Sequence, residues 1–186
     1  MAHKLLAVFG EKYSNTDSAR SLFPETAGAK VHYYPKMEDI FKAVDSGKAL
    51  WGIVPRENSN AGKVTETQEN FKKYPQITIL SVQKKKIEHH LLGLRGADVQ
   101  AIARIFSHAQ ALNQCRTWLQ KNLPVVLLEE TSSTATAARN ISESKDKTRA
   151  AIASRSAAEA YGLDILAENI QSPNNVTEFI LVCKKK

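Results

Sequence analysis

The stretch that decides the fold class is Val31–Val54, VHYYPKMEDIFKAVDSGKALWGIV. Its residues up to position 34 are β-branched or aromatic and favour a strand. The next segment, 35–44, has a proline in its first turn and a glycine shortly after its end, as helices prefer. The apolar residues of that segment recur at helical spacing and share one face: Met37, Ile40, Phe41 and Val44. Residues 50–54 are apolar again and stop at a proline, so the stretch predicts a strand, a helix and a second strand.

The same alternation extends in both directions from this stretch. Helices are expected over 14–22, 64–71, 109–119, 134–141 and 156–161. Strands are expected over 4–9, 102–106, 125–128, 149–153, 165–170 and 177–183, and one long extended segment over 77–94. Strands that alternate with helices predict an α/β protein with mainly parallel strand pairing.

Length and composition indicate an ordinary globular protein. The 186 residues suffice for one compact unit or two small lobes. Hydrophobic residues make up 42% and charged residues 24%, which excludes a disordered chain, a collagen and a coiled coil. No apolar run approaches the ~18 residues of a membrane-spanning helix. The apolar stretch near the N-terminus is too short for a signal peptide, so we expect a cytoplasmic protein with no membrane partner.

The chain is basic, with 26 Lys and Arg against 19 Asp and Glu, a formal net charge of +7. Its two lysine runs, 84–86 and 184–186, lack the interleaved aromatic residues with which proteins bind single-stranded nucleic acid. We therefore interpret them as a solvated edge and tail, and expect no nucleic-acid partner. The net charge suits an anionic small substrate instead.

The sequence predicts neither a metal site nor a disulfide. Its two cysteines, Cys115 and Cys183, lie in apolar surroundings and form no zinc-binding pattern, so both are interpreted as reduced thiols. His89 and His90 are neighbours, and on a strand they face opposite ways.

Polar clusters stand where expected strands end, which is where ligands bind in open α/β sheets. They occupy 55–62, 107–115 and 129–138, and a further one, 174–179, leads into the last strand. In the third, a run of hydroxyl residues opens an alanine-rich helix, whose first amides and dipole favour a carboxylate or phosphate. Taken singly, each cluster also fits a structural interpretation, as a capped helix, a turn or a strand.

Taken in order, the clusters resemble the catalytic domain of prephenate dehydratase. The segments that carry the resemblance are PRENSNAG at 55–62, SHAQALNQC at 107–115, SSTATAA at 132–138 and NVTEF at 175–179. The resemblance covers roughly residues 5–182. It implies an α/β fold of two lobes, resembling type II periplasmic binding proteins, with the ligand cleft between the lobes. The first lobe would be 1–81 plus 165–186 and the second 82–164, together one prephenate dehydratase-like domain. No phenylalanine-regulatory domain is expected after it, and the family implies a homodimer or a dimer of dimers.

The resemblance implies a lyase of phenylalanine biosynthesis that converts prephenate, a dianion, to phenylpyruvate with loss of water and carbon dioxide. The reaction needs no cofactor and no metal. Thr177 matches the family's threonine, to which proton donation at the leaving hydroxyl is assigned. The other catalytic matches are Glu57, Asn58, Ser107 and Gln114. The substrate-binding matches are Ser14, Ser59, Ser132, Ser133, Thr134 and Phe179, the last as a wall for the ring.

Two departures from the family pattern keep alternatives open. The family's Thr-Arg-Phe is Thr177-Glu178-Phe179 here, which places an anion beside the proposed acid. The family's Gly-Thr-Phe-Ser loop is Glu11-Lys12-Tyr13-Ser14. The alternatives are a relative with altered chemistry, such as a prephenate decarboxylase, and a non-catalytic module that binds a small anion.

Overall fold

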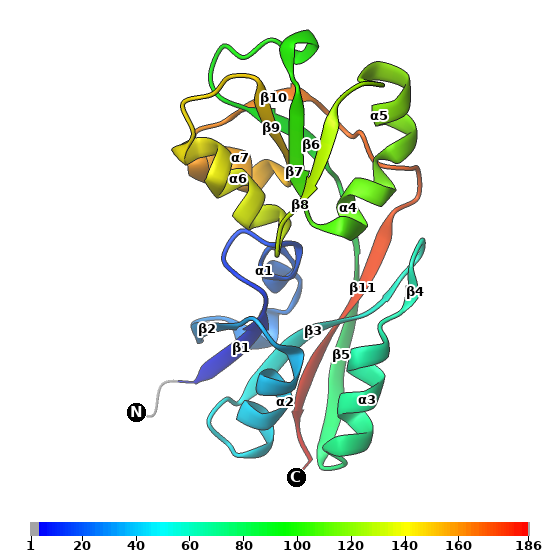
Figure 1. The fold of residues 1–186 in the computed structure, drawn as a ribbon. Coiled ribbons are helices and arrows are strands. Elements are labelled where there is room, and N and C mark those ends of the chain that lie inside the picture. The colour runs from blue at the N-terminus through cyan, green and yellow to red at the C-terminus, as the bar shows by residue number, and fades with distance from the viewer. Residues whose placement is uncertain (1–3, 186) are drawn as a thin grey trace. The chain divides into compact units, whose positions relative to one another are not determined.

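A computed structural model describes residues 4–185 of the chain (Figure 1). The chain folds into two compact units. Unit 1 comprises Met1–Ile87 and Val176–Lys186, and unit 2 comprises Glu88–Asn175. The chain therefore crosses from unit 1 to unit 2 after Ile87 and returns after Asn175.

These boundaries differ from the lobes expected at 1–81 plus 165–186 and at 82–164. Residues 82–87 belong to unit 1 because strand β5 (Ile77–Lys86) pairs along its length with strand β11 (Val176–Lys184). Residues 165–175 belong to unit 2 because strand β10 (Asp164–Ala167) pairs with strand β6 (His90–Gly93).

Unit 1 is built on one mixed sheet with strand order β2-β1-β3-β11-β5, and the short β4 pairs with β3. Its remaining strands are β1 (Leu5–Phe9), β2 (Lys30–Tyr34), β3 (Trp51–Asn58) and β4 (Gly62–Lys63). Its helices are α1 (Asn15–Ala19), α2 (Met37–Asp45) and α3 (Thr65–Lys73), with 3-10 turns at Arg20–Leu22 and Pro24–Thr26. The stretch 31–54 forms the expected strand, helix and strand.

The two faces of this sheet have separate hydrophobic cores. One core gathers Ile180 and Val182 of β11 with the apolar face of α2. The other gathers Phe179 and Leu181 with Ala19 of α1 and Phe23. Successive side chains of a strand point to opposite faces, so this alternation fixes which face each residue of β11 occupies.

Unit 2 is built on a second mixed sheet with strand order β10-β6-β9-β7-β8. Its other strands are β7 (Arg104–Ser107), β8 (Leu127–Glu130) and β9 (Arg149–Ala153). Its helices are α4 (Ala109–Gln114), α5 (Arg116–Asn122), α6 (Thr134–Glu143) and α7 (Arg155–Tyr161), with a 3-10 turn at Val99–Ala101. Its principal core packs α4 and α5 against β6, β7 and β9.

Three expectations about the elements were wrong. Strand pairing is mixed, because β11 runs antiparallel to both its neighbours and β6 runs antiparallel to β9 and β10. The extended segment 77–94 is two strands that belong to different sheets. The helix over 109–119 breaks at Cys115, whose backbone leaves the helical region (φ −99°, ψ 0°).

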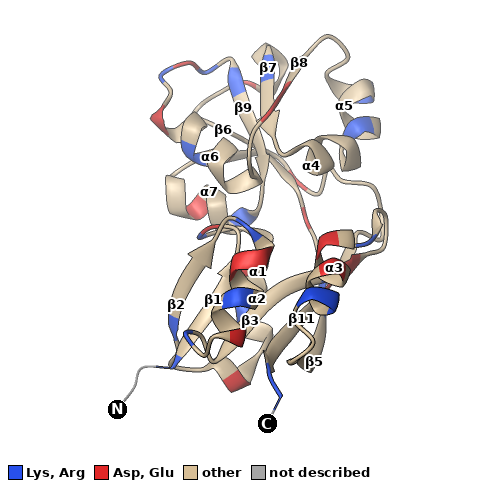
Figure 2. Ribbon diagram, turned by 60° about the horizontal axis from the view of Figure 1, so that its bottom comes forward, with Lys and Arg blue, Asp and Glu red and all other residues tan. Residues whose placement is uncertain are grey.

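The charged residues of unit 1 follow ordinary helix electrostatics. Helix α3 has Glu66 in its first turn and Lys72 and Lys73 in its last (Figure 2). Acidic residues at the start and basic residues at the end of a helix interact favourably with its dipole. The run Lys84–Lys86 ends β5 with Lys84 and Lys86 exposed, as expected of a solvated edge.

Candidate functional site

In unit 1, the polar residues of the first and last motifs meet across strands β3 and β11. Asn58 and Thr177 are direct partners in the antiparallel register of these strands. The Asn58 amide Nδ2 donates to Thr177 Oγ1 at 2.8 Å. Both side chains are almost fully buried, with 5% and 9% exposed. Residues 119 positions apart in sequence therefore form one hydrogen-bonded pair.

The orientation of the Asn58 amide is fixed by the loop that follows it. Asn58 Oδ1 accepts from the backbone amides of Asn60 at 3.0 Å and Ala61 at 3.1 Å. Because the oxygen is held by the loop, the NH₂ group faces Thr177. The Thr177 hydroxyl oxygen accepts this bond and is buried. It is thus a buried hydroxyl whose oxygen is oriented by the Asn58 amide.

Ser59 supports the same region through the backbone. Its amide donates to the Val176 carbonyl at 2.9 Å, and its Oγ accepts from the Val176 amide at 2.9 Å. These two bonds fix the chain immediately before Thr177. The Ser59 hydroxyl therefore already has a partner in strand β11. A substrate-binding role for Ser59 stays a prediction.

Glu178 forms an ion pair with Arg56 of the neighbouring strand. Its neighbours in β11, Thr177 and Phe179, alternate with it, and Phe179 lies in the core on one face while Ile180 lies in the core on the other. Glu178 therefore points to the face opposite Thr177. The anion that replaces the family's arginine is neutralised locally and does not face the proposed acid. Glu57 is exposed on β3.

Phe179 does not have the position expected of a wall for the substrate ring. Its side chain is 1% exposed and packs in the core with Leu6, Phe23 and Leu181. Since the ring is enclosed by apolar neighbours, the structure gives Phe179 a packing role beneath Thr177.

Ser14 caps helix α1, with its Oγ accepting from the Asp17 amide at 3.2 Å. Asp17 in turn accepts from Arg20 at 2.8 Å and from the Tyr33 hydroxyl at 2.7 Å. Burial, reinforced by the bond to Asp17, raises the pKa of Tyr33 to about 12.

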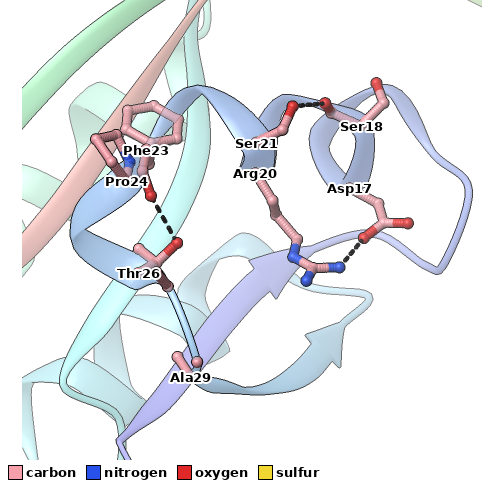
Figure 3. A pocket seen from close by; sticks show the side chains of 10 residues that line it. Asp17, Ser18, Arg20, Ser21, Phe23, Pro24, Thr26 and Ala29 are labelled. Carbon is pink, nitrogen blue, oxygen red and sulfur yellow. Dashed lines mark hydrogen bonds and ion pairs between the residues drawn. The ribbon is translucent and has the colours of Figure 1, made fainter.

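A hollow of about 490 Å³ lies beside this network, lined by Asp17, Arg20, Phe23 and their neighbours (Figure 3). Its cation is already paired with Asp17, and none of the matched motif residues lines it. The hollow is therefore not the candidate site.

In unit 2, the hydroxyl-rich motif opens helix α6 as expected. Ser133 is the N-cap, and its Oγ accepts from the Thr136 amide at 2.9 Å. Ser132 is exposed, and Thr134 is the first helical residue. The buried face of the helix is alanine: Ala135, Ala137 and Ala138. The start of α6 has the donors that a carboxylate needs.

Ser107 has a structural role that the sequence did not predict. It is 0% exposed, and its hydroxyl donates to the Ile152 carbonyl at 2.6 Å, which ties β7 to β9. The cap of helix α4 is the next residue, His108, whose ring nitrogen accepts from the Gln110 amide at 3.3 Å. The catalytic role expected for Ser107 stays a prediction, while its hydroxyl has a structural bond in unit 2.

Gln114 belongs to a buried polar network with Asn175, the first residue of the last motif, and with His89, which lies in no motif. Its Oε1 lies 2.9 Å from His89 Nε2 and accepts from Asn175 Nδ2 at 3.1 Å. Gln114 Nε2 donates back to Asn175 Oδ1 at 3.3 Å. Burial lowers the pKa of His89, and the hydrogen bond to Gln114 acts in the opposite direction. The sequence signal for this network was a histidine within the apolar alternation of Ile87, His89 and Leu91.

Among residues 4–185, no group of three His, Cys, Asp or Glu side chains is placed to hold a metal ion. In the same range, no helix has the length and apolar character to span a bilayer. Burial raises the pKa of the Cys115 thiol to about 12, so this cysteine is an unreactive packing residue.

Comparison with known proteins agrees with this arrangement. The family model described as "Prephenate dehydratase" matches residues 6–186. A bifunctional chorismate mutase/prephenate dehydratase of Neisseria gonorrhoeae is 42% identical over 80% of this chain and 41% of its own length. A prephenate dehydratase of Methanocaldococcus jannaschii is 41% identical over 84% of this chain and 55% of its own length. The chain thus spans about half the length of these curated relatives.

The solved structures confirm the expected fold class. A prephenate dehydratase from Arthrobacter aurescens, crystallised with L-Phe, has a TM-score of 0.89 at 30% identity and covers 98% of this chain and 61% of that one. A methionine-bound nutrient binding protein from Burkholderia cenocepacia shares the fold alone, with a TM-score of 0.53 at 12% identity over 97% of this chain and 84% of that one. The family model, the identities and the matched motifs lead to one conclusion: this chain belongs to the prephenate dehydratase family.

Proposed function

We propose that this chain is the catalytic domain of a prephenate dehydratase, and that it converts prephenate to phenylpyruvate, water and carbon dioxide. The observation that carries the proposal is the Asn58–Thr177 pair, which joins the first and last family motifs at 2.8 Å. Family membership supports the substrate class. The net charge of +7 favours association with a dianion.

The proposed step uses the Thr177 proton. As the ring carbon–oxygen bond of prephenate breaks, the hydroxyl leaves with its electron pair and takes this proton to become water. The bond between the ring and its carboxylate breaks at the same time, and its electron pair completes the aromatic ring as carbon dioxide departs. The reaction consumes one proton overall, so solvent must return a proton to Thr177.

Threonine is a weak acid, so its oxygen needs stabilisation as the proton leaves. The Asn58 Nδ2–H that points at Oγ1 supplies it, because a pre-oriented donor stabilises developing negative charge. Burial of both side chains strengthens this interaction relative to water. The pair therefore has the chemistry that protonation of a leaving hydroxyl requires.

We assign the start of α6 as a seat for a substrate carboxylate. Ser133 caps this ten-residue helix, and its neighbours Ser132 and Thr134 add hydroxyl groups. A helix N-terminus attracts anions through its amides and its dipole. An arginine at position 178 is not needed to balance charge beside Thr177, since Glu178 is paired with Arg56 and points to the other face.

The test is incubation of the purified protein with prephenate, followed by identification of the products. We expect phenylpyruvate. A non-aromatic keto acid that keeps the ring hydroxyl, or binding without turnover, would overturn the proposal.

The role of Thr177 is tested with matched variants. Thr177→Ala should lower kcat by about 10²-fold or more, because general acid catalysis contributes roughly that much. Thr177→Ser, which keeps the hydroxyl, should retain most of the activity. Thr26→Ala removes another buried threonine, one that bonds to the Phe23 carbonyl and not to Asn58, and serves as the control. Equal losses in Thr177→Ala and Thr26→Ala would contradict an acid role.

A further inference from the structure

His89 is the second residue of unit 2. Its side chain is 2% exposed. Its backbone is fixed on both sides: its amide donates to Gln171 Oε1 at 2.7 Å, and its carbonyl accepts from the Ile170 amide at 2.9 Å. A polar ring in such a position needs a reason beyond packing.

The contacts of Gln114 define which imidazole nitrogen carries the proton. Gln114 and Asn175 form a reciprocal amide pair in which Gln114 Oε1 is an acceptor. His89 Nε2, 2.9 Å from that oxygen, must then donate. His89 Nδ1 is buried and has no partner among the described residues. A proton on Nδ1 would leave a buried donor unpaired and set two acceptors against each other, so the ring is neutral with its hydrogen on Nε2.

The network holds the segment that leads to Thr177. The backbone carbonyl of Gln114 accepts from both the amide and the hydroxyl of Ser172, at 2.8 and 3.0 Å. Its side chain holds Asn175, the last residue of unit 2. Val176 and Thr177 follow directly along the chain. Asn175 is thus held within unit 2 by Gln114, and Gln114 is held by His89.

We propose that His89 is a positioning residue for Thr177: its Nε2–H orients Gln114, which holds Asn175 and so sets the backbone from which the Thr177 hydroxyl is presented. This inference rests on the proposed function, because it assigns Thr177 the role given there. His89 itself touches neither Thr177 nor the reacting atoms.

Two variants of His89 separate positioning from packing. His89→Phe keeps a ring but removes the donor, whereas His89→Gln restores an N–H that can reach Gln114. We expect His89→Phe to lower kcat about tenfold to hundredfold, the usual cost of a small displacement of a reacting group. KM should change less than about threefold, because a loss confined to kcat marks an interaction made in the transition state. His89→Gln should recover most of kcat.

The control is His90→Phe. His90 is buried to the same degree, at 1% exposed, but its ring accepts from the Asn169 amide and not from Gln114. His90→Phe should lower the melting temperature about as much as His89→Phe and leave kcat near the parent value. Equal kcat losses in the two variants, or no rescue by His89→Gln, would overturn the proposal.

NMR spectroscopy tests the role of His89 even if the protein does not turn over prephenate. The ¹⁵N chemical shifts of the His89 ring should report a neutral imidazole protonated on Nε2. The amide and methyl resonances of Thr177 should shift in His89→Phe and return in His89→Gln. A ring protonated on Nδ1, or Thr177 resonances that stay unchanged in His89→Phe, would refute the positioning role independently of activity.

Discussion

At the scale of single residues, both the oxygen and the nitrogen of the Asn58 side-chain amide form hydrogen bonds. Its oxygen accepts two loop amides, and its nitrogen donates to Thr177. Asn58→Asp keeps an oxygen for the loop and the volume of the side chain, but replaces the donor with a second acceptor. We expect kcat to fall by about 10²-fold, the usual effect of losing one oriented donor.

Asn60→Asp is the matched control for that change, because it adds the same charge on an exposed residue of the same loop. Steady-state kinetics on both variants, with melting temperatures, gives the comparison. If Asn58→Asp retained the parent kcat, the Asn58 donor would have no part in catalysis.

The Arg56–Glu178 pair supports a second prediction at this scale. Glu178→Arg sets two cations together and should lower the free energy of unfolding by about 1 kcal/mol, the upper part of the range for exposed ion pairs, because this pair is partly buried. The charge-swapped double variant, Arg56→Glu with Glu178→Arg, should recover most of it. Because Glu178 points away from Thr177, kcat should change little, and urea unfolding with kinetics measures both effects. A large gain in kcat from Glu178→Arg would show that the glutamate impairs the site.

At the scale of elements, the start of α6 was predictable and the ends of β5 and β6 were not. The run Ser132 to Thr134 before an alanine-rich segment is a capping pattern, which depends on local chemistry alone. The break between β5 and β6 depends on which sheet each half joins, and the alternation of apolar residues continues through it. Tertiary pairing decides such a boundary.

The same limit applies to two site residues that the structure shows to be buried. Phe179 and Ser107 match family motifs by residue type, but whether a motif residue faces a ligand or the core depends on packing. Asn58 and Thr177 were selected because they match family motifs, and their catalytic roles stay predictions. The motifs did not predict that the two side chains meet, because the register of β3 and β11 determines that contact.

Helix α6 also gives a test of the carboxylate seat. Ser133→Ala removes the cap and should cost about 1 kcal/mol of stability. Ser133→Asp keeps a good cap but places an anion at the start of the helix, so stability should stay while KM for prephenate rises. Ser132→Ala, which leaves the cap intact, is the control. An unchanged KM in Ser133→Asp would exclude this helix start as a carboxylate seat.

At the scale of the whole molecule, the chain crosses between its units twice, and a polar side chain is buried next to each crossing. His89 follows the first crossing and Asn175 precedes the second. Such groups are stable in the folded protein only while they keep their hydrogen bonds and their neutral state. The dependence of stability on pH therefore reports on this region.

Burial lowers the pKa of His89, and burial followed by Arg155 lowers that of His90, both from an ordinary value of 6.5. The unfolded chain then binds more protons than the folded one as pH falls below that value. Stability is therefore full above it and declines on acidification, by at most about 1.4 kcal/mol per pH unit for each histidine. Melting temperatures between about pH 7.5 and about pH 5.5, above the range where most carboxylates titrate, should show the decline. His89→Gln should make this decline in stability smaller, because an amide does not titrate. If the variant lost stability on acidification as steeply as the parent, protonation of His89 would not contribute to the decline.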